Sequence, residues 1–548
     1  MEPVSREPVP MALEPAQAEL LRPAGMFDAV SRRQTLGDML ARSVRRFPDK
    51  RAIECGAHHW TYAQFDNVVD DLASGLSAAG VVPGDRVALM SRNSHWFAAL
   101  RFAVARAGAV LVPVNFMLNS DDVAYILDHS RSSVLFTDAG CAATALAAAD
   151  KVGLALRYGI PGEGGFGDVG MEPIDGTRDF RGLLGTGAPR PDPACIDARS
   201  IVQIIYTSGT ESRPKGAMLS HEAVIWQYQS CVADCGWTAD AVALHVLPLF
   251  HCAQLDAFLG PALQVGARNI IAAAPTPDIV LPLIEKHAIT SFFAPPTVWI
   301  ALLRSPLFDP ARLTSLTHGY YGASIMPVEV LKELRQRLPW VRLWNCYGQT
   351  EIAPVAAVLQ PEDQERKAGA AGRPTLHVET RIVDDDMNDL PAGQVGEIVH
   401  RSPQLMTAYW RDPARTAEAF AGGWFHSGDL GMMDAEGYIT VVDRKKDMIK
   451  TGGENVASRE VEEAIYILPD VSEVAVVGLP DARWIEAVTA FIVPKAGADL
   501  TAAQVLAHCA AYLSGFKVPK RVVFVQNLPR NASGKILKRD LRQMADAG

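Results

Sequence analysis

The chain has 548 residues, 49% of them hydrophobic and 21% charged, an ordinary globular composition with room for roughly two to four domains. Its formal net charge of -10 at pH 7 argues against a nucleic-acid-binding protein, which would carry an excess of lysine and arginine. Eight cysteines in so long a chain do not form a disulfide scaffold, so we expect free thiols and a cytoplasmic location.

The first segment, residues 1–30, contains many prolines and acidic residues, and we expect a flexible arm rather than a secretory leader. No uncharged apolar run approaches the roughly 20 residues needed to span a bilayer. We therefore predict no transmembrane anchor, while peripheral contact with a membrane stays open.

Short apolar runs then alternate with helical patterns. Residues 86–90, 109–114 and 133–137 have the composition of buried strands, and residues 94–107 form a helical pattern. Residues 201–206 predict another strand, and residues 217–232 predict a helix. Strands that alternate with helices favour an α/β fold, so we expect a large multi-layer domain with mostly parallel sheets over residues 31–443.

The clearest domain boundary lies at Asp443, where a strand pattern meets a dense cluster of charges. The patterns beyond it are helices at 459–467 and 502–513 and strands at 474–477, 488–493 and 521–525. We expect residues 444–548 to form a small, mobile α+β domain.

The segment YTSGTESRPKG, which begins at Tyr206, has the chemistry of a phosphate-binding loop. Gly209 allows the backbone to direct N–H groups at an anion, and Thr207, Ser208 and Thr210 add hydroxyl donors. Lys215 adds a positive charge. The spacing is not that of a Walker A loop, so these residues alone leave a surface turn as the alternative.

Seven segments in order carry a resemblance to a known family. They are YTSGTESRPKGAMLSH, LPLFH, YYGAS, YGQTE, HSGDLG, DRKKDMIKTGGEN and NASGKILKR. In this order they resemble the adenylate-forming superfamily, which includes acyl-CoA synthetases, aryl-CoA ligases, peptide-synthetase adenylation domains and firefly-type luciferases. The resemblance implies that ATP first joins AMP to a carboxylic acid, with release of pyrophosphate, and that a thiol then attacks the mixed anhydride. Such chemistry needs a triphosphate-binding loop, Mg²⁺ and positive charge at the α-phosphate.

The resemblance also implies roles for individual residues. The residues expected to contact ATP or AMP are Thr207, Ser208, Gly209, Thr210, Lys215, Gly322, Ala323, Ser324, Asn345, Tyr347, Gly348, Asp429, Arg444, Lys446 and Lys450. Among them, Tyr347 is expected to pack on adenine and Asp429 to accept the ribose hydroxyls. The expected catalytic residues are Lys535, Thr350, Glu351 and His251, with Glu351 and Thr210 as ligands of Mg²⁺.

The implied mechanism uses two orientations of the small domain. Lys535 would bridge the carboxylate and the α-phosphate in the first step, and Asp443 would be the hinge. Thr451, Gly452 and Gly453 would line the tunnel for the pantetheine arm of coenzyme A, where missing side chains leave room.

The chain departs from the family's pattern at three places. Glu211 and Ser212 stand where threonine and glycine are usual, and we expect altered ATP affinity because Glu211 would repel a triphosphate unless Arg213 neutralises it. Ile485 and Cys346 stand where many relatives have glycine, and Cys346 lies beside the expected acyl channel.

We therefore expect an AMP-forming carboxylic acid–CoA ligase. Apolar residues such as Leu255, Ala257 and Phe258 favour a medium- or long-chain fatty acid, with an aryl acid as the alternative. Two other functions stay open, namely loading of a free-standing carrier protein and non-catalytic binding of a nucleotide or an acyl-AMP. His251 replaces the aspartate of amino-acid-activating relatives, which argues against an amino acid. The oligomeric state stays open, with a homodimer as one candidate.

Overall fold

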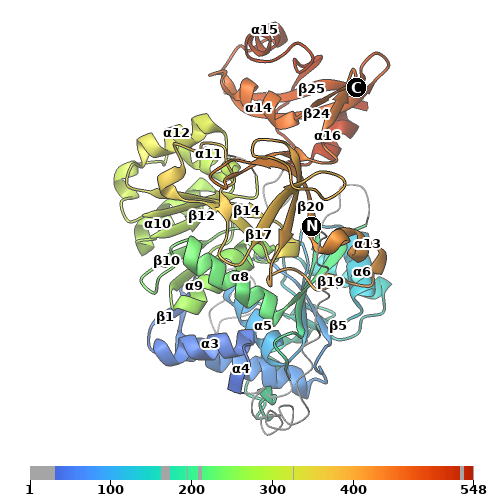
Figure 1. The fold of residues 1–548 in the computed structure, drawn as a ribbon. Coiled ribbons are helices and arrows are strands. Elements are labelled where there is room, and N and C mark those ends of the chain that lie inside the picture. Colours follow the sequence, from blue (N-terminus) through green and yellow to red (C-terminus); the bar gives the residue numbers. More distant parts are fainter. Residues whose placement is uncertain are drawn as a thin grey trace, which may run out of the picture.

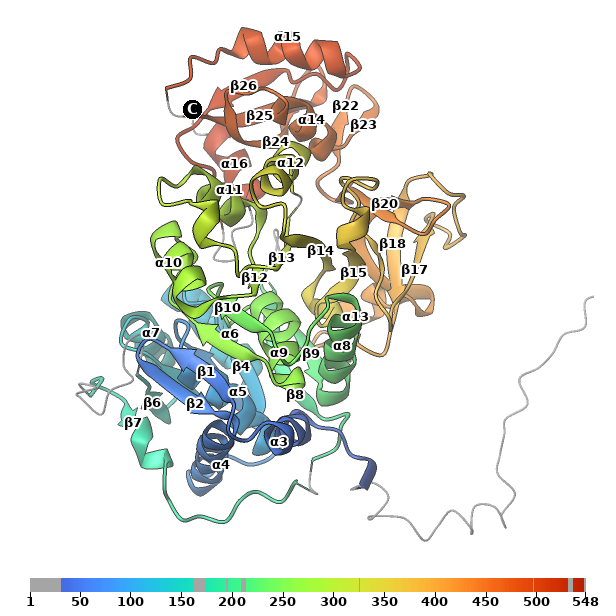
Figure 2. The same cartoon turned by 90° about the vertical axis from the view of Figure 1, so that its left-hand side faces the viewer.

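The computed structural model describes residues 31–161, 173–193, 196–207, 213–324, 326–495, 497–530 and 536–546. The expected arm, residues 1–30, lies outside these ranges. Figures 1 and 2 show a large body, coloured blue to yellow, with a smaller orange-to-red unit at one end. Within the described ranges no helix is both long enough and apolar enough to cross a bilayer.

The first sheet of the large body has eight strands in the order β19-β9-β8-β4-β3-β5-β6-β7. The strands from β8 to β7 pair in parallel, and β9 and β19 extend the sheet in the antiparallel sense. The predicted strands at 86–90, 109–114 and 133–137 are confirmed here. The bounds are β3 (Arg86–Met90), β4 (Val110–Pro113), β5 (Ser132–Thr137), β6 (Arg157–Gly159), β7 (Arg178–Asp179), β8 (Ile201–Thr207), β9 (Lys215–Ser220) and β19 (Ala408–Tyr409).

The second sheet has nine strands in the order β16-β15-β14-β13-β12-β10-β11-β1-β2. Its central strands are parallel, and β2, β15 and β16 pair antiparallel at its two edges. The bounds are β1 (Arg51–Cys55), β2 (His58–Thr61), β10 (Val242–His245), β11 (Arg268–Ile271), β12 (Ser291–Phe293), β13 (His318–Gly322), β14 (Arg342–Gly348), β15 (Val355–Leu359) and β16 (Arg373–Pro374).

Helix α5 (His95–Arg106) lies in the core that the two sheets share. All of its residues except Trp96 and Arg106 are buried, and one buried cluster joins it to strands of both sheets. A helix that is buried on nearly every side lies inside the core rather than at its surface. Ser94 caps the helix by accepting a hydrogen bond from the N–H of Phe97. The predicted helix at 94–107 is therefore confirmed.

Several other helices begin at local capping signals. Thr35, Thr61 and Thr501 each form a capping box with the residue three positions later. The helices of the large body are α3 (Leu36–Arg46), α4 (Tyr62–Ala78), α6 (Ser120–Ser130), α7 (Ala142–Lys151), α8 (His221–Asp234), α9 (Gly260–Val265), α10 (Pro277–His287), α11 (Pro296–Arg304), α12 (Val328–Arg337) and α13 (Pro413–Ala419). A π-helix, η4 (Ala253–Leu259), precedes α9, and a short 3-10 turn, η6 (Thr350–Ile352), follows β14.

The helix predicted at 217–232 begins later than expected. Residues Lys215–Ser220 form β9, which pairs with β8 on one side and β19 on the other, and α8 follows from His221 to Asp234. These pairings are long-range contacts that override the local helical pattern. Ser220 then caps α8 through the N–H of Ala223.

A third sheet and the small unit complete the chain. The third sheet is antiparallel, with β17 (Glu379–Val383), β18 (Gly396–Arg401), β20 (Phe425–Met433) and β21 (Ile439–Arg444). The small unit has a sheet of β22 (Ile449–Thr451), β23 (Glu454–Val456), β24 (Val471–Asp481), β25 (Ile485–Pro494) and β26 (Arg521–Phe524) with α14 (Ser458–Tyr466), α15 (Ala502–Tyr512) and α16 (Lys538–Asp546). It has a buried core of its own around Val461, Val476 and Ile492. The expected α/β body with a smaller α+β unit is thus observed.

Candidate functional site

The expected phosphate loop connects β8 and β9. Thr207 and Lys215 lie opposite each other where the two strands end, so the loop leaves and re-enters the sheet at one point. Ser208, Gly209, Thr210, Glu211 and Ser212 lie outside the described residues.

Helix α6 supports both ends of this loop. The hydroxyl of Tyr206 and Nδ1 of His129 are hydrogen-bonded at 2.8 Å, and the ring of Tyr125 stacks on His129. The hydroxyl of Tyr125 donates to the carbonyl of Pro214, and the guanidinium of Arg213 lies 5.1 Å from the centroid of the Tyr125 ring. Arg213 therefore has a cation–π partner in α6.

Tyr409 links the phosphate hairpin to Glu351. The ammonium group of Lys215 lies 5.0 Å from the centroid of the Tyr409 ring. The hydroxyl of Tyr409 donates a 2.8 Å hydrogen bond to Oε1 of the buried Glu351, and the N–H of Met406 donates to the Glu351 carbonyl. Burial, and then the charge of Glu351, raise the pKa of Tyr409, which keeps the hydroxyl protonated as the donor. No motif in the sequence pointed to Tyr409.

Thr350 lies near the N-terminal end of the π-helix, beside Cys252, the residue that follows His251. The hydroxyl of Thr350 and the thiol of Cys252 are 3.2 Å apart, and Nδ1 of His251 accepts a hydrogen bond from the N–H of Ala253. Burial raises the pKa of Cys252 to about 12, so the thiol stays neutral. Two residues far apart in the chain, His251 and Thr350, are thus held close together.

Asn93 supports the loop before His251. Its side chain donates to the carbonyl of Leu247 and accepts from the N–H of Leu249, both at 2.8 Å. Gln254 also accepts from the N–H of Leu247 and contacts Nδ1 of the buried His245. These bonds satisfy backbone groups of a buried loop, which fixes its path.

Tyr347, Asp429 and Arg444 form a second polar group. The Tyr347 hydroxyl donates a 2.6 Å hydrogen bond to one oxygen of Asp429, and Nε of Arg444 lies 2.7 Å from the other. Asp429 and Arg444 are direct partners across β20 and β21. Burial acts to lower the pKa of Arg444, but the surrounding charges, with that of Asp429 the largest among them, together raise that pKa. Tyr347 lies at the end of β14 and Glu351 in the η6 turn that follows, so the two polar groups are neighbours in the chain.

Gly322, Ala323 and Ser324 lie at the carboxyl end of β13, beside β14. A Cβ on Gly322 would lie 2.3 Å from the carbonyl oxygen of Cys346, so this approach requires glycine. The same holds at Gly348, where a Cβ would meet the carbonyl of Pro354. Asn345 donates from its side chain to the carbonyl of Ala370.

Asp443 joins the large body to the first helix of the small unit. Its Oδ2 accepts both the N–H and the hydroxyl of Ser458, each at 2.7 Å, and its Oδ1 accepts the N–H of Arg444. Lys538 of α16 donates to the Ser458 hydroxyl and forms a 3.0 Å ion pair with Glu462. Ser458 was not expected from the sequence.

The expected residues for coenzyme A lie in the turn between β22 and β23. Gly452 and Gly453 have φ values of 61° and 90°, the left-handed region that favours glycine. The N–H of Gly452 donates to the carbonyl of Trp484, whose ring covers it. The side chain of Thr451 is buried, whereas Lys446 and Lys450 are exposed. Lys535 lies outside the described residues.

Phe258 of the π-helix belongs to an aromatic cluster. Phe258 stacks on Phe293 with ring centroids 4.0 Å apart, and Trp237 stacks on Tyr320 at 5.6 Å. The two pairs meet because Phe258 also contacts Tyr320. Cys346 belongs to the same buried cluster. The indole N–H of Trp237 is buried without a hydrogen-bond partner among the described residues.

Comparison with known proteins gives matches over almost the whole chain. Residues 40–410 match the family model for AMP-binding enzymes, and residues 460–535 match that for the C-terminal domain of AMP-binding enzymes. The feruloyl-CoA synthase of an Amycolatopsis species is 37% identical over 93% of this chain and 99% of its own length. The long-chain-fatty-acid–CoA ligase FadD13 of Mycobacterium tuberculosis is 33% identical over 89% of this chain and 93% of its own. ATP-bound MatB from Rhodopseudomonas palustris superposes with a TM-score of 0.83 at 31% identity, over 93% of this chain and 98% of that one.

Proposed function

The chain belongs to the AMP-binding enzyme family, and from this premise we propose that it joins a ring-bearing hydrophobic acid to coenzyme A through an acyl-adenylate. The broader activity follows from the family and its relatives. The protein is an AMP-forming carboxylic acid–CoA ligase that uses ATP, Mg²⁺ and coenzyme A. The acid and the roles of single residues are our proposal.

One observation carries the assignment of the nucleotide site. Tyr347 and Arg444 hold the two oxygens of the buried Asp429, and Glu351 follows Tyr347 closely in the chain. Arg444 and Tyr347 each contact one oxygen of Asp429 and so orient its carboxylate, which is suited to accept ribose hydroxyls. Lys215 at the hairpin would balance the triphosphate charge, and Thr350 with His251 would contact the α-phosphate.

The surroundings of Glu351 fit a magnesium ion. Tyr409 occupies only one carboxylate oxygen, Oε1, so Oε2 is left for a hard cation that keeps most of its waters. Bound there, Mg²⁺ would offset charge on the phosphate oxygens. Tyr409 would hold the carboxylate in place, and Thr210 would add a hydroxyl ligand.

The second half-reaction would require movement at Asp443. Its two hydrogen bonds to Ser458 fix the start of α14 against the end of β21, which suits a residue at which the small domain turns. We propose the boundary between domains here, with Lys535 acting in the first step and Thr451, Gly452 and Gly453 lining the coenzyme A tunnel in the second.

The aromatic cluster favours a ring-bearing acid. Flat rings pack well on Phe258, Trp237 and Tyr320, and an acceptor atom on the acid would satisfy the buried indole N–H of Trp237. The feruloyl-CoA synthase relative supports this choice. A long-chain fatty acid is the second candidate, supported by the identity to FadD13.

Pyrophosphate release with a panel of aryl and fatty acids, with and without coenzyme A, tests the proposal. We expect release and thioester formation with a phenylpropenoic acid at a higher kcat/KM than with fatty acids. A higher kcat/KM for a fatty acid would favour the second candidate. Release without thioester would indicate another acceptor, such as a carrier protein, and no release with any acid would indicate non-catalytic binding.

A further inference from the structure

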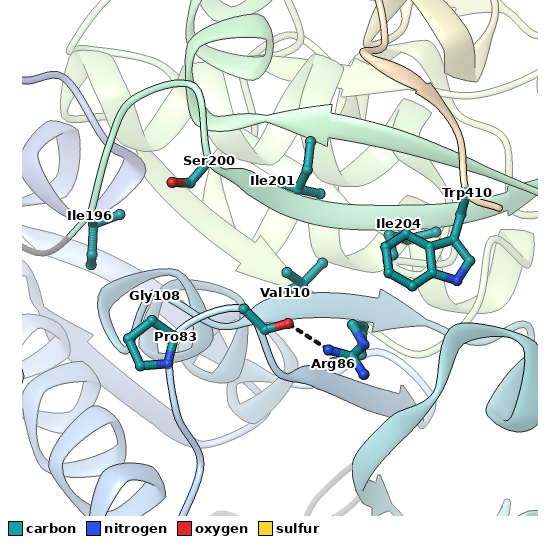
Figure 3. A pocket seen from close by; sticks show the side chains of 10 residues that line it. Pro83, Arg86, Gly108, Val110, Ile196, Ser200, Ile201, Ile204 and Trp410 are labelled. Atoms are coloured by element: carbon teal, nitrogen blue, oxygen red, sulfur yellow. Dashed lines mark hydrogen bonds between the residues drawn. The ribbon is translucent and has the colours of Figure 1, made fainter. Parts of the chain in front are cut away.

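A cavity of about 390 Å³ opens between β8 and the beginning of β3 and β4 (Figure 3). Leu111 of β4 lies opposite Gln203 of β8, and the cavity is lined by residues on either side of this pair. Its walls are mainly apolar and come from Pro83, Val110, Ile196, Ile201, Ile204 and Trp410. This volume falls within the range of about 300 to 1,000 Å³ that is usual for small-molecule sites.

Arg86 brings a positive charge to the lining of this cavity. Its guanidinium donates to the carbonyls of Gly84, Ser130 and Arg131, which fixes its position, and lies 5.8 Å from the centroid of the Trp410 ring. Within the described residues, the hydrogen-bond acceptors of the Arg86 guanidinium are backbone carbonyls rather than carboxylates. A guanidinium has five N–H donors, so donors remain for an anion.

We propose that this cavity binds a hydrophobic organic anion, namely a carboxylate that carries a ring or a medium-length alkyl chain. The carboxylate would pair with Arg86, and the apolar body would lie against Ile201, Ile204 and Trp410. Charge-assisted hydrogen bonds favour an anion at a fixed guanidinium, and apolar walls favour a hydrophobic body. The site is separate from the acid site of the proposed function.

Strand β19 connects this cavity to the nucleotide site. Trp410 follows Tyr409 directly, lines the cavity, and donates its backbone N–H to the carbonyl of Gly216. Tyr409 holds Glu351 and lies under Lys215. A ligand against Trp410 would therefore act on the strand that positions Tyr409, and the cavity is a regulatory site for ATP binding.

Isothermal titration calorimetry on the full chain tests the proposal. Octanoate and phenylacetate are the probes, 1-octanol is the neutral comparison, and an octanoyl- or phenylacetyl-sulfamoyl adenosine blocks the acid site. We expect one further equivalent of carboxylate to bind in the blocked protein, with little binding of 1-octanol. Binding should also change the affinity for a non-hydrolysable ATP analogue.

Two variants and two matched controls locate the site. Arg86→Gln removes the charge and Val110→Phe fills the cavity, and each should weaken carboxylate binding about tenfold or more, the scale of one charge-assisted hydrogen bond. Arg157→Gln on β6 and Val82→Phe at the exposed neighbour of Pro83 should leave it unchanged, because neither residue lines the cavity. Thermal melts check that each variant is folded.

Each result decides a separate point. Absence of a second equivalent in the parent protein, or equal binding to Arg86→Gln and Val110→Phe, would overturn the site. Equal binding of 1-octanol would overturn the role of Arg86, and an unchanged ATP-analogue affinity would overturn the regulatory role. If the cavity binds octanoate or phenylacetate only when that acid is also a substrate of the enzyme, the effector is the substrate acid itself. Failure of the sulfamoyl adenosines to bind would count against the proposed function instead.

Discussion

The hydroxyl of Tyr409 donates a 2.8 Å hydrogen bond to the carboxylate of Glu351, 58 residues away in the chain. The same Tyr409 ring lies under the ammonium group of Lys215. One side chain on a two-residue strand thus touches the residue proposed to hold Mg²⁺ and the residue proposed to balance the phosphates. Loss of the Tyr409 side chain should therefore affect the binding of Mg²⁺ and of the phosphates, but not the binding of the carboxylic acid.

Tyr409→Phe should therefore raise the Mg²⁺ concentration for half-maximal activity by about tenfold or more, the usual effect of losing a residue that orients a metal ligand. The ring and its contact with Lys215 are kept. Magnesium titrations of pyrophosphate release measure the effect. Tyr438→Phe is the matched control, because it also removes a hydroxyl bonded to a carboxylate, Asp363, but outside the site. An equal loss in both variants would contradict the assignment.

Ile485→Gly should stabilise the small unit. Ile485 has a φ of 69° and is 66% exposed, so a β-branched residue occupies a left-handed conformation and gains little from burial. We expect a gain of about 1 kcal/mol in the free energy of unfolding, measured by urea denaturation. Ile467→Gly is the control, because Ile467 is also exposed but has a φ of -64°, and it should destabilise. A loss of stability in Ile485→Gly would show that the strain argument is wrong.

Glu211→Thr combined with Ser212→Gly should lower the KM for ATP. Both residues lie outside the described ranges, so the prediction rests on the sequence and on the repulsion between a carboxylate and a triphosphate. The cation–π contact of Arg213 with Tyr125 gives this arginine a partner other than Glu211. Steady-state kinetics at saturating acid give the measurement, and the same ATP KM and rate as the parent would refute the idea.

Trp237→Phe should reduce kcat/KM about tenfold for acids with an acceptor on the ring, the scale of one buried hydrogen bond to the indole N–H. Acids without the acceptor should lose little, because the phenyl ring keeps the stacking surface. The ratio of the two kcat/KM values, rather than either alone, is the readout. Trp344→Phe, in the same aromatic cluster but with its indole bonded to Gln360, is the control and should not change this ratio.

Acid should destabilise the protein through three buried histidines. Burial lowers the pKa of His221 to about 3, and of His245 and His400 to about 4. These pKa values are below the unfolded value of about 6.5. The stability that the three neutral side chains contribute is therefore complete above pH 6.5 and is lost as the pH falls toward 4. Each proton that the unfolded chain takes up lowers the free energy of unfolding by up to about 1.4 kcal/mol per pH unit in this window.

Urea denaturation between pH 7 and pH 4 measures this slope. His400→Asn should reduce it by about one proton relative to the parent, because the unfolded chain then takes up one proton fewer. His59→Asn is the control, since His59 is exposed, and it should leave the slope unchanged. Equal slopes for the parent and His400→Asn would contradict the role of buried histidines.

The sequence predicted the parts of the fold that depend on local pattern. The helix around Phe97 and the strand at 86–90 carry apolar runs whose length and spacing are sufficient to identify them. The predicted start of α8 was wrong because residues 215–220 pair with β8 and also with β19. The second pairing depends on residues that are distant in the chain. Tyr409 and Ser458 escaped notice for the same reason, since each acts only through a partner brought close by folding.

Motif order indicated the candidate site more fully than local pattern could. Asp429, Arg444 and Tyr347, which the resemblance assigned to the nucleotide, lie together, although no spacing along the chain predicts that they touch. The sequence also flagged Ile485 as unusual, and the structure supplies the physical meaning, a left-handed backbone at a β-branched residue.

The position of α5 has a consequence for how the protein comes apart. Because this helix packs in one cluster with strands of both large sheets, neither sheet can lose its tertiary contacts while the other keeps them. The large body should therefore melt as one cooperative unit, and proteases should find no stable half of it. The small unit has its own core and joins the body near Asp443, so it can open by itself. Local opening there would expose the proposed coenzyme A turn while the proposed nucleotide site stays folded.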